Sequence, residues 1–110
     1  MYKVTVKSVR PNIQDNFFRY DDDMYDYIDE TYFQTGKILL RETTVSEDLS
    51  IETCTTIFNT KADWLEYFKD PVIAYQEPIK VRYNIYHKIA VSTNLEDIVV
   101  TKDLYNLYLR

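Results

Sequence analysis

The stretch KILLRETTVSEDLSIETCTTIF, residues 37–58, has the most regular pattern in this chain of 110 residues. Its two halves, 37–46 and 49–58, are rich in Ile, Leu, Val and Thr, which favour β-strands. Glu47 and Asp48 between them are compatible with a turn. The stretch therefore predicts a β-hairpin. The period of two assigns the side chains of its second strand to two faces, with Leu49, Ile51 and Ile57 on one and Cys54 and Phe58 on the other.

Upstream of the hairpin, the sequence predicts a strand followed by a helix. Residues 2–9 alternate apolar and polar side chains, as a half-buried strand does, and Pro11 ends the pattern. Residues 15–34 carry apolar side chains at helical spacing, with Asp15 or Asn16 as the expected N-cap and a break near 21–23 as the alternative. Gly36 stands where a left-handed C-cap is expected.

Downstream of the hairpin, a second helix is predicted from Lys61, because Thr60 and Asp63 have the spacing of a capping box. Pro71 either kinks this helix or opens a short second one through residue 76.

The remaining residues are harder to assign. Residues 79–91 alternate like a strand, which we favour, although a helical stripe beginning at Pro78 also fits. Residues 94–110 predict a short strand around the apolar run 98–100, followed by a short helix that carries Leu104 and Leu107.

The resulting order β-α-β-β-α-β is that of the ferredoxin-like α+β class, in which helices cover one face of an antiparallel sheet. We expect one domain over 1–110, ending in a short C-terminal extension. Residues 60–89 contain a loose set of matching positions: Thr60, Trp64, Phe68, Asp70-Pro71 and Arg82-Tyr83-Asn84. With this set, the segment resembles the dimeric α+β barrel domains related to antibiotic-biosynthesis monooxygenases. The resemblance implies that two subunits pack sheet to sheet. The haem-degrading members use an Asn, Trp and His set that this chain does not match, because no His follows Trp64 at the required distance.

Composition excludes several classes of site. A single Gly rules out phosphate-binding loops and dinucleotide fingerprints, which need two or more. One Cys and one His supply neither an internal disulfide nor a four-ligand zinc site, and we expect no cofactor and no metal. The N-terminus lacks the apolar run of a signal peptide, and no stretch is long enough to span a membrane, so we expect a cytoplasmic protein. With three Ala and abundant Tyr, Ile, Asn and Lys, the composition resembles AT-rich coding sequence. A bacteriophage accessory protein, in the host cytoplasm, fits it.

The net charge of −5 comes from one segment. Residues 15–30 hold seven acidic residues against Arg19, whereas the rest of the chain is nearly neutral. Such a run is usually a solvated face, and consecutive Asp side chains on a helix point too far apart to share one metal ion. Interleaved Tyr residues favour protein docking as its function. The predicted docking residues, for a partner with a basic surface, are Tyr20, Asp21, Asp22, Asp23, Tyr25, Asp26, Asp29 and Glu30.

A second candidate site is a small-molecule pocket lined by Trp64, Phe68, Tyr83 and His87, although aromatic residues at helical spacing usually belong to a core. His87 and Cys54 are the only candidates for a thiolate–imidazolium pair, and nothing around Cys54 in the sequence would lower its pKa. Nucleic acid is not an expected partner, because no basic run exists.

The sequence therefore predicts a small interaction or regulatory protein that forms a homodimer and has no catalytic activity. The alternatives are a small-molecule-binding or oxygenase-like enzyme of the dimeric barrel type, and a passive component of an oligomer.

Overall fold

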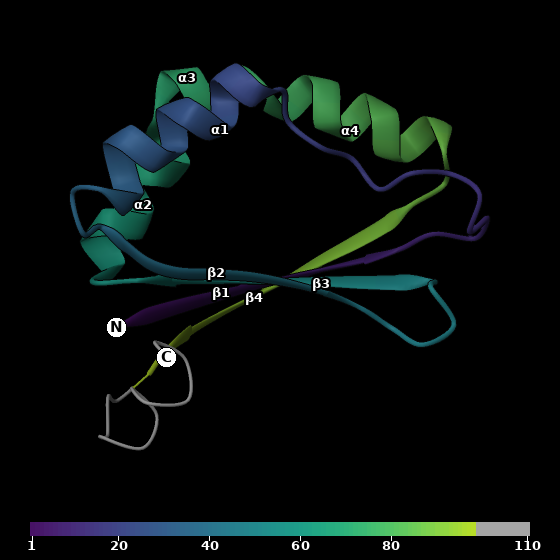
Figure 1. The fold of residues 1–110 in the computed structure, drawn as a ribbon, viewed down its shortest axis with the longest axis horizontal. Coiled ribbons are helices and arrows are strands. Elements are labelled where there is room, and N and C mark those ends of the chain that lie inside the picture. The colour runs from purple at the N-terminus through teal and green to yellow at the C-terminus, as the bar shows by residue number, and fades with distance from the viewer. Residues whose placement is uncertain (99–110) are drawn as a thin grey trace.

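The computed structural model describes residues 1–98, which form one four-stranded antiparallel sheet with all helices on one of its faces (Figure 1). The sheet order is β2-β3-β1-β4, so the first strand lies inside the sheet and is flanked by β3 and β4. This arrangement confirms the predicted ferredoxin-like α+β class. The elements are β1 (Tyr2–Val9), α1 (Asp22–Ile28), the π-helical turn η1 (Asp29–Phe33), β2 (Ile38–Val45), β3 (Ile51–Phe58), α2 (Lys61–Lys69), α3 (Pro71–Ala74), α4 (Glu77–Tyr86) and β4 (Ala90–Asp97).

The predicted hairpin is confirmed as β2 and β3, joined by a turn in which Leu49 has a positive φ of 65°. Residues opposite one another on neighbouring strands share a face of the sheet. Phe58 pairs with Tyr2, and Cys54 pairs with Val6 and Thr43, so the even-numbered side chains of β3 point to the helices. Ile51 and Ile57 lie on the opposite face, as predicted.

The buried core gathers at one end of the sheet. Tyr2, Ile38 and Phe58 meet there in register, and α1, η1 and α3 pack on them. Met24, Ile28, Tyr32 and Ile73 complete the cluster. Burying side chains of this size contributes about 1.5–3 kcal/mol each, so this end provides most of the apolar stabilisation of the fold.

Helix α2 begins at Lys61, as predicted. The Thr60 hydroxyl accepts from the Asp63 backbone N–H at 3.1 Å and donates to the Asp63 carboxylate at 2.9 Å. Pro71 opens a separate short helix, α3, whose N-cap is Asp70. Gly36 has a φ of +77°, which confirms the left-handed position after the first helical segment.

The predicted helix over 15–34 is wrong in its first third. The helical segment begins at Asp22, and Asp21, not Asp15 or Asn16, caps it by accepting from the Met24 N–H at 2.8 Å. Residues 10–21 form an irregular segment, which we call the strap, that runs alongside α4 to the start of α1 (Figure 1). Its backbone carbonyls bond to arginine side chains instead of helical N–H groups: Arg10 donates to Asp15 O at 2.7 Å and Arg19 to Phe18 O at 2.9 Å.

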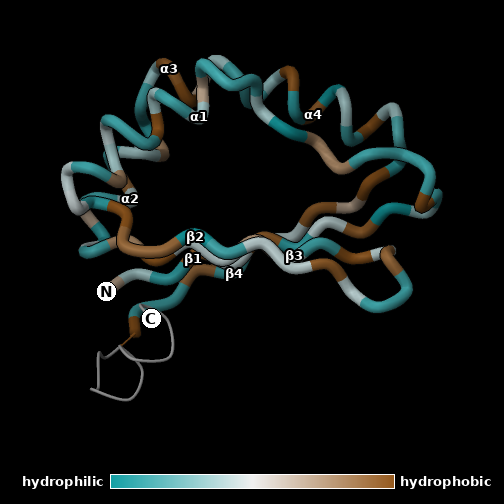
Figure 2. The backbone as a smooth tube through the Cα atoms, in the orientation of Figure 1, coloured by the Kyte–Doolittle hydropathy of each residue, from teal (hydrophilic) through white to brown (hydrophobic). Residues whose placement is uncertain are grey.

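The predicted strand over 79–91 is also wrong. Residues 77–86 form α4, with Pro78 in its first turn, and the strand β4 starts only at Ala90, after Lys88 has turned the chain with a φ of 56°. Apolar and polar residues alternate along α4 in Figure 2, and this alternation has the period of two that is typical of a strand. The face that packs inward is polar and aromatic: Lys80, Tyr83, Asn84 and His87, at spacings of three and four. The expected strand at 98–100 and the helix after it fall, from Val99 onward, outside the described residues.

Candidate functional site

A cavity of about 300 Å³ lies at the opposite end of the sheet from the core. Its floor is the helix-facing side of β1, β2 and β3, and its walls are the strap, the first turn of α1 and the inward face of α4. Aromatic, polar and charged side chains line it: Val6, Ser8, Phe17, Phe18, Arg19, Tyr20, Tyr25, Arg41, Thr43, Glu52, Cys54, Lys80 and Asn84.

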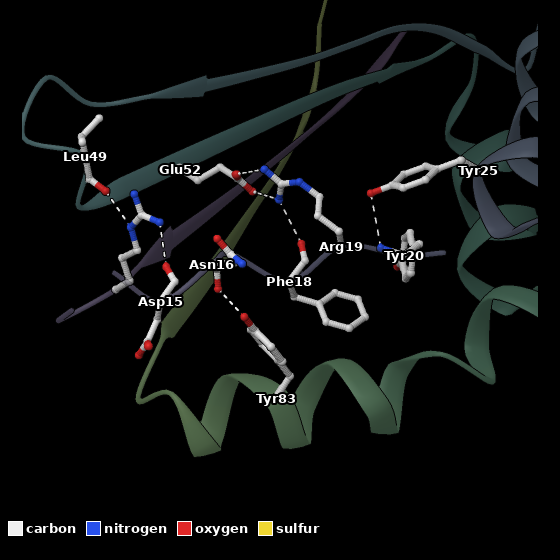
Figure 3. A network of polar contacts seen from close by, with 10 residues as sticks. Asp15, Asn16, Phe18, Arg19, Tyr20, Tyr25, Leu49, Glu52 and Tyr83 are labelled. Carbon is white, nitrogen blue, oxygen red and sulfur yellow. Dashed lines mark hydrogen bonds and ion pairs between the residues drawn. The ribbon is translucent and has the colours of Figure 1, made fainter. Parts of the chain in front are cut away.

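The strap is fastened to the sheet by a bidentate ion pair at the cavity wall (Figure 3). Arg19 donates from Nη1 to Glu52 Oε1 at 3.0 Å and from Nη2 to Oε2 at 2.5 Å. The Glu52 side chain is only 10% exposed, and its hydrogen bond raises the pKa of Arg19 above the ordinary value. The charges of Glu52 and Arg19 therefore compensate each other, and Arg19 does not provide a free positive charge for a ligand.

Helix α4 holds the strap from its other side. The Tyr83 hydroxyl donates to the backbone carbonyl of Asn16 (Figure 3), and His87 Nδ1 lies 3.1 Å from Asp15 Oδ2. Tyr83 and His87 are one helical turn apart, with ring centroids at 4.3 Å. These contacts make the strap a bridge between the two layers, so its position defines the shape of the cavity.

Aromatic rings form the apolar part of the lining. Phe18 meets Tyr20 edge-on at 5.5 Å, and Tyr20 meets Tyr25 at 5.7 Å. The Tyr25 hydroxyl accepts from the Tyr20 N–H at 3.3 Å, which joins the end of the strap to α1. Burial raises the pKa of Tyr20, which therefore stays a neutral phenol at pH 7.

Arg41, on β2, is the cation in the floor of the cavity. Burial acts to lower the pKa of Arg41, but its interactions with neighbouring side chains raise that pKa overall, so the guanidinium is always protonated. Burial in turn raises the pKa of the Tyr67 hydroxyl, so this neighbour is uncharged at pH 7. Among residues 1–98, none of the ion pairs includes Arg41.

The four predicted pocket residues do not line this cavity. Trp64 lies against Tyr2 at 5.1 Å and Phe68 at 5.5 Å, beside the core, and Phe68 is 65% exposed. Tyr83 and His87 hold the strap instead, as described above. Cys54 and His87 are not brought together either: His87 contacts Asp15 and two tyrosine rings, whereas Cys54 lies in the floor beside Arg41.

The predicted docking residues lie on α1 and η1, next to the cavity. Asp22, Asp23, Asp26 and Glu30 are exposed, whereas Asp21 is occupied as the N-cap. Asp29 is exposed too and accepts from Gln34 Nε2 at 2.8 Å. Tyr20 and Tyr25, the predicted aromatic docking residues, contact each other and line the cavity. Within the described part of the chain, no group of acidic, His or Cys side chains is arranged to hold a metal ion.

Sequence reasoning missed Arg41 and Glu52, and it considered Cys54 only as a partner of His87 and not as a residue of this cavity. A signal for them existed, because Arg41 and Thr43 on one strand and Glu52 and Cys54 on the next occupy alternate positions, and so share a face. What the sequence did not show is that this face lies beneath a strap.

Among residues 1–98, no helix is long and apolar enough to cross a membrane. No family model and no curated protein matches the sequence. A solved structure described as a putative antibiotic biosynthesis monooxygenase from Deinococcus radiodurans is similar in fold, with a TM-score of 0.52 over 90% of this chain and 94% of that one. The sequence identity is 4%, so the likeness concerns the fold alone. It confirms the resemblance in fold predicted from residues 60–89 and extends it over nearly the whole chain: this protein has a ferredoxin-like α+β fold similar to that of this structure.

Proposed function

We propose that this protein binds a small organic molecule in the cavity between the sheet and the helices. The observation that carries the proposal is the cavity itself, about 300 Å³ in volume and lined by aromatic rings together with a few polar groups. Ligand pockets commonly combine such an apolar lining with a small number of polar groups that fix the orientation of the ligand. The fold similarity to a putative monooxygenase supports a small-molecule role, with oxygenation as the reaction to be tested after binding.

Binding is tested with 2-naphthol, a flat neutral probe, by ligand-observed NMR and calorimetry. Thr43→Phe fills the cavity, whereas Thr44→Phe adds the same ring to the opposite face of the same strand. We expect the wild type and Thr44→Phe to bind and Thr43→Phe to lose binding at least tenfold. Equal binding by the two variants, or no binding to the wild type, contradicts the proposal.

Cys54 offers an independent reading of occupancy, because it is the only thiol in the chain and it lines the cavity. Saturating 2-naphthol should slow the alkylation of Cys54 by iodoacetamide severalfold. An unchanged rate with bound probe would place the probe elsewhere on the protein.

As a second function, we propose that the exposed acidic face of α1 docks a protein with a basic surface. The supporting observation is that Asp22, Asp23, Asp26 and Glu30 are exposed, and none of the ion pairs among residues 1–98 includes them. Charges of one sign on one face steer and retain an oppositely charged partner in a salt-dependent manner.

The docking test changes Asp22, Asp23 and Asp26 to Asn and keeps Asp21, whose carboxylate caps the helix. The matched control changes Glu42, Glu47 and Glu77 to Gln, which removes the same charge from exposed positions elsewhere. Partner capture from native extract at low salt should be lost only with the α1 variant. Equal capture by both variants excludes docking through this face.

We also propose that two copies pair through the sheet. The support is that the helices cover only one face of it (Figure 1) and that every residue of β4, an edge strand, is exposed. Light scattering coupled to size exclusion should give about twice 13.2 kDa at micromolar concentration. A monomer mass under these conditions would exclude the dimer.

A further inference from the structure

From the charges in the cavity we infer that its ligand is an aromatic organic acid, whose carboxylate is held by Arg41. The inference rests on the proposed small-molecule function and adds the chemical class of the ligand.

The first step is the charge balance of the cavity lining. Three cations, Arg19, Arg41 and Lys80, face one anion, Glu52. Arg19 and Glu52 neutralise each other through their bidentate pair. Two positive charges are therefore left in a cavity of a protein whose net charge is −5. A positive charge balance inside a cavity attracts anionic ligands to it, although the protein as a whole is acidic.

The second step is the surroundings of Arg41. Arg41 interacts with the side chains of Tyr67, Cys54 and Tyr20, and the two tyrosines are neutral at pH 7. A guanidinium that is withdrawn from water needs a counter-charge to recover the lost hydration. Within residues 1–98, no carboxylate forms an ion pair with Arg41 or with Lys80. A carboxylate of the ligand would complete the site, since the planar guanidinium fork matches that group with two parallel hydrogen bonds.

The third step is the body of the ligand. Phe18, Tyr20 and Tyr25 surround the cavity with ring edges and faces, at centroid distances of 5.5 and 5.7 Å. Aromatic rings pair best with other rings in offset or edge-to-face arrangements, which favours a flat aromatic body. Asn84 on α4 adds a neutral polar group to the wall of the cavity.

The experiment compares 2-naphthoate with 2-naphthamide, which have nearly the same shape and differ by one charge. Calorimetry at pH 7 should show 2-naphthoate binding to the wild type at least about tenfold more tightly, the effect of one good charged hydrogen-bonding pair. Arg41→Met should reduce this ratio to near one while leaving the amide affinity within a factor of two or three. Arg41→Lys, which keeps the charge without the fork, should recover part of the ratio.

The matched control is Arg82→Met, which removes the same charge from an exposed position of α4 outside the cavity lining. It should keep the full preference for the acid. Circular dichroism and the thermal midpoint establish whether each variant is folded. If Arg41→Met does not fold, Arg41→Lys is the test, and a preference for the acid that is smaller than in the wild type is then the expected result.

The outcomes separate the two proposals. If neither compound binds, the proposed small-molecule function fails. If both bind equally well to the wild type, the cavity binds small molecules and the inference about organic acids is wrong. If the preference for the acid survives in Arg41→Met, or disappears in Arg82→Met, the charge that selects the anion is not at Arg41.

Discussion

The hydroxyl of Tyr32 donates a 2.6 Å hydrogen bond to Oδ2 of Asp70, and thereby ties η1 to the start of α3 across 38 residues of sequence. Tyr27 donates to the same oxygen, also at 2.6 Å, while Oδ1 accepts from the Val72 N–H at 2.9 Å. Burial alone would raise the pKa of Asp70, but these donors lower it below its ordinary value. Asp70 is thus a buried carboxylate that joins two helical segments and stays ionised.

Removing one of these donors is expected to destabilise the fold. Tyr32→Phe removes one of the two tyrosine hydroxyls that donate to the buried Asp70 carboxylate, so we expect the free energy of unfolding to fall by about 1–2 kcal/mol. Urea denaturation measures it. The control Tyr75→Phe changes an exposed tyrosine and should stay within about 0.5 kcal/mol of the wild type. A loss of the same size in both variants would contradict the role of this hydrogen bond.

A pH titration tests the turn of the central hairpin. Hydrogen bonds from Ser46 and Ser50 lower the pKa of Asp48 from 3.8 to about 2. Because the folded-state pKa is lowered, Asp48 contributes stability above pH 3.8 and loses it as the pH falls through 2. Carboxyl NMR should show the low pKa in the wild type and a rise toward 3.8 in Ser50→Ala. Ser92→Ala, on β4, should leave the pKa unchanged, and an equal rise there would contradict this assignment.

Gly36 tests backbone conformation alone. Its φ is +77°, and a Cβ added there would meet no heavy atom within 4 Å. We expect Gly36→Ala to cost about 1–2 kcal/mol in urea denaturation, entirely from the left-handed backbone. Gly36→Asn should cost less, since Asn tolerates this region better than Ala does. Equal costs for the two variants would point to a different cause.

The strap should loosen when its link to α4 is removed. Tyr83→Phe deletes the hydrogen bond to the Asn16 carbonyl, whereas Tyr86→Phe changes an 81% exposed side chain on the same helix. Hydrogen exchange at the amides of residues 10–21 should be accelerated severalfold by Tyr83→Phe only, with little change in global stability. Equal exchange in both variants would mean that Tyr83 does not hold the strap.

Much of the fold was predictable because local patterns and tertiary packing agree. The alternation in 2–9, the hairpin over 37–58 and the cap at Thr60 each carry their own signal. The strap was mistaken for helix because Phe17 and Phe18 fit the helical spacing of the residues after them. Arg10 and Arg19 instead attach the strap to the sheet region through Leu49 O and Glu52, partners that lie far away in the sequence.

Helix α4 was mistaken for a strand for a related reason. Its inward face carries Lys80, Tyr83 and Asn84, which meet a strap and a cavity instead of an apolar core. Apolar periodicity reports burial in apolar surroundings, so a helix that packs on polar groups gives only a weak helical signal, and here the helical stripe from Pro78 was outweighed by the strand-like alternation. The candidate site was missed on the same ground, since Arg41 and Cys54 become cavity residues only when the strap covers them.

The core cluster lies at one end of the sheet and the cavity at the other, so the residues that stabilise the fold are largely separate from those that shape the cavity. The packing of Tyr2, Ile38 and Phe58 stabilises the fold, whereas the strap and the inward face of α4 determine which ligands the cavity accommodates. In the strap, Phe17 is buried, Arg19 pairs with the nearly buried Glu52, and Tyr20 packs against the core cluster. Substitutions at Phe18, which lines the cavity outside that cluster, would therefore alter the ligand range at the least cost to folding. Redesign of binding would start from Phe18 and from the inward face of α4, and would leave the core end of the sheet unchanged.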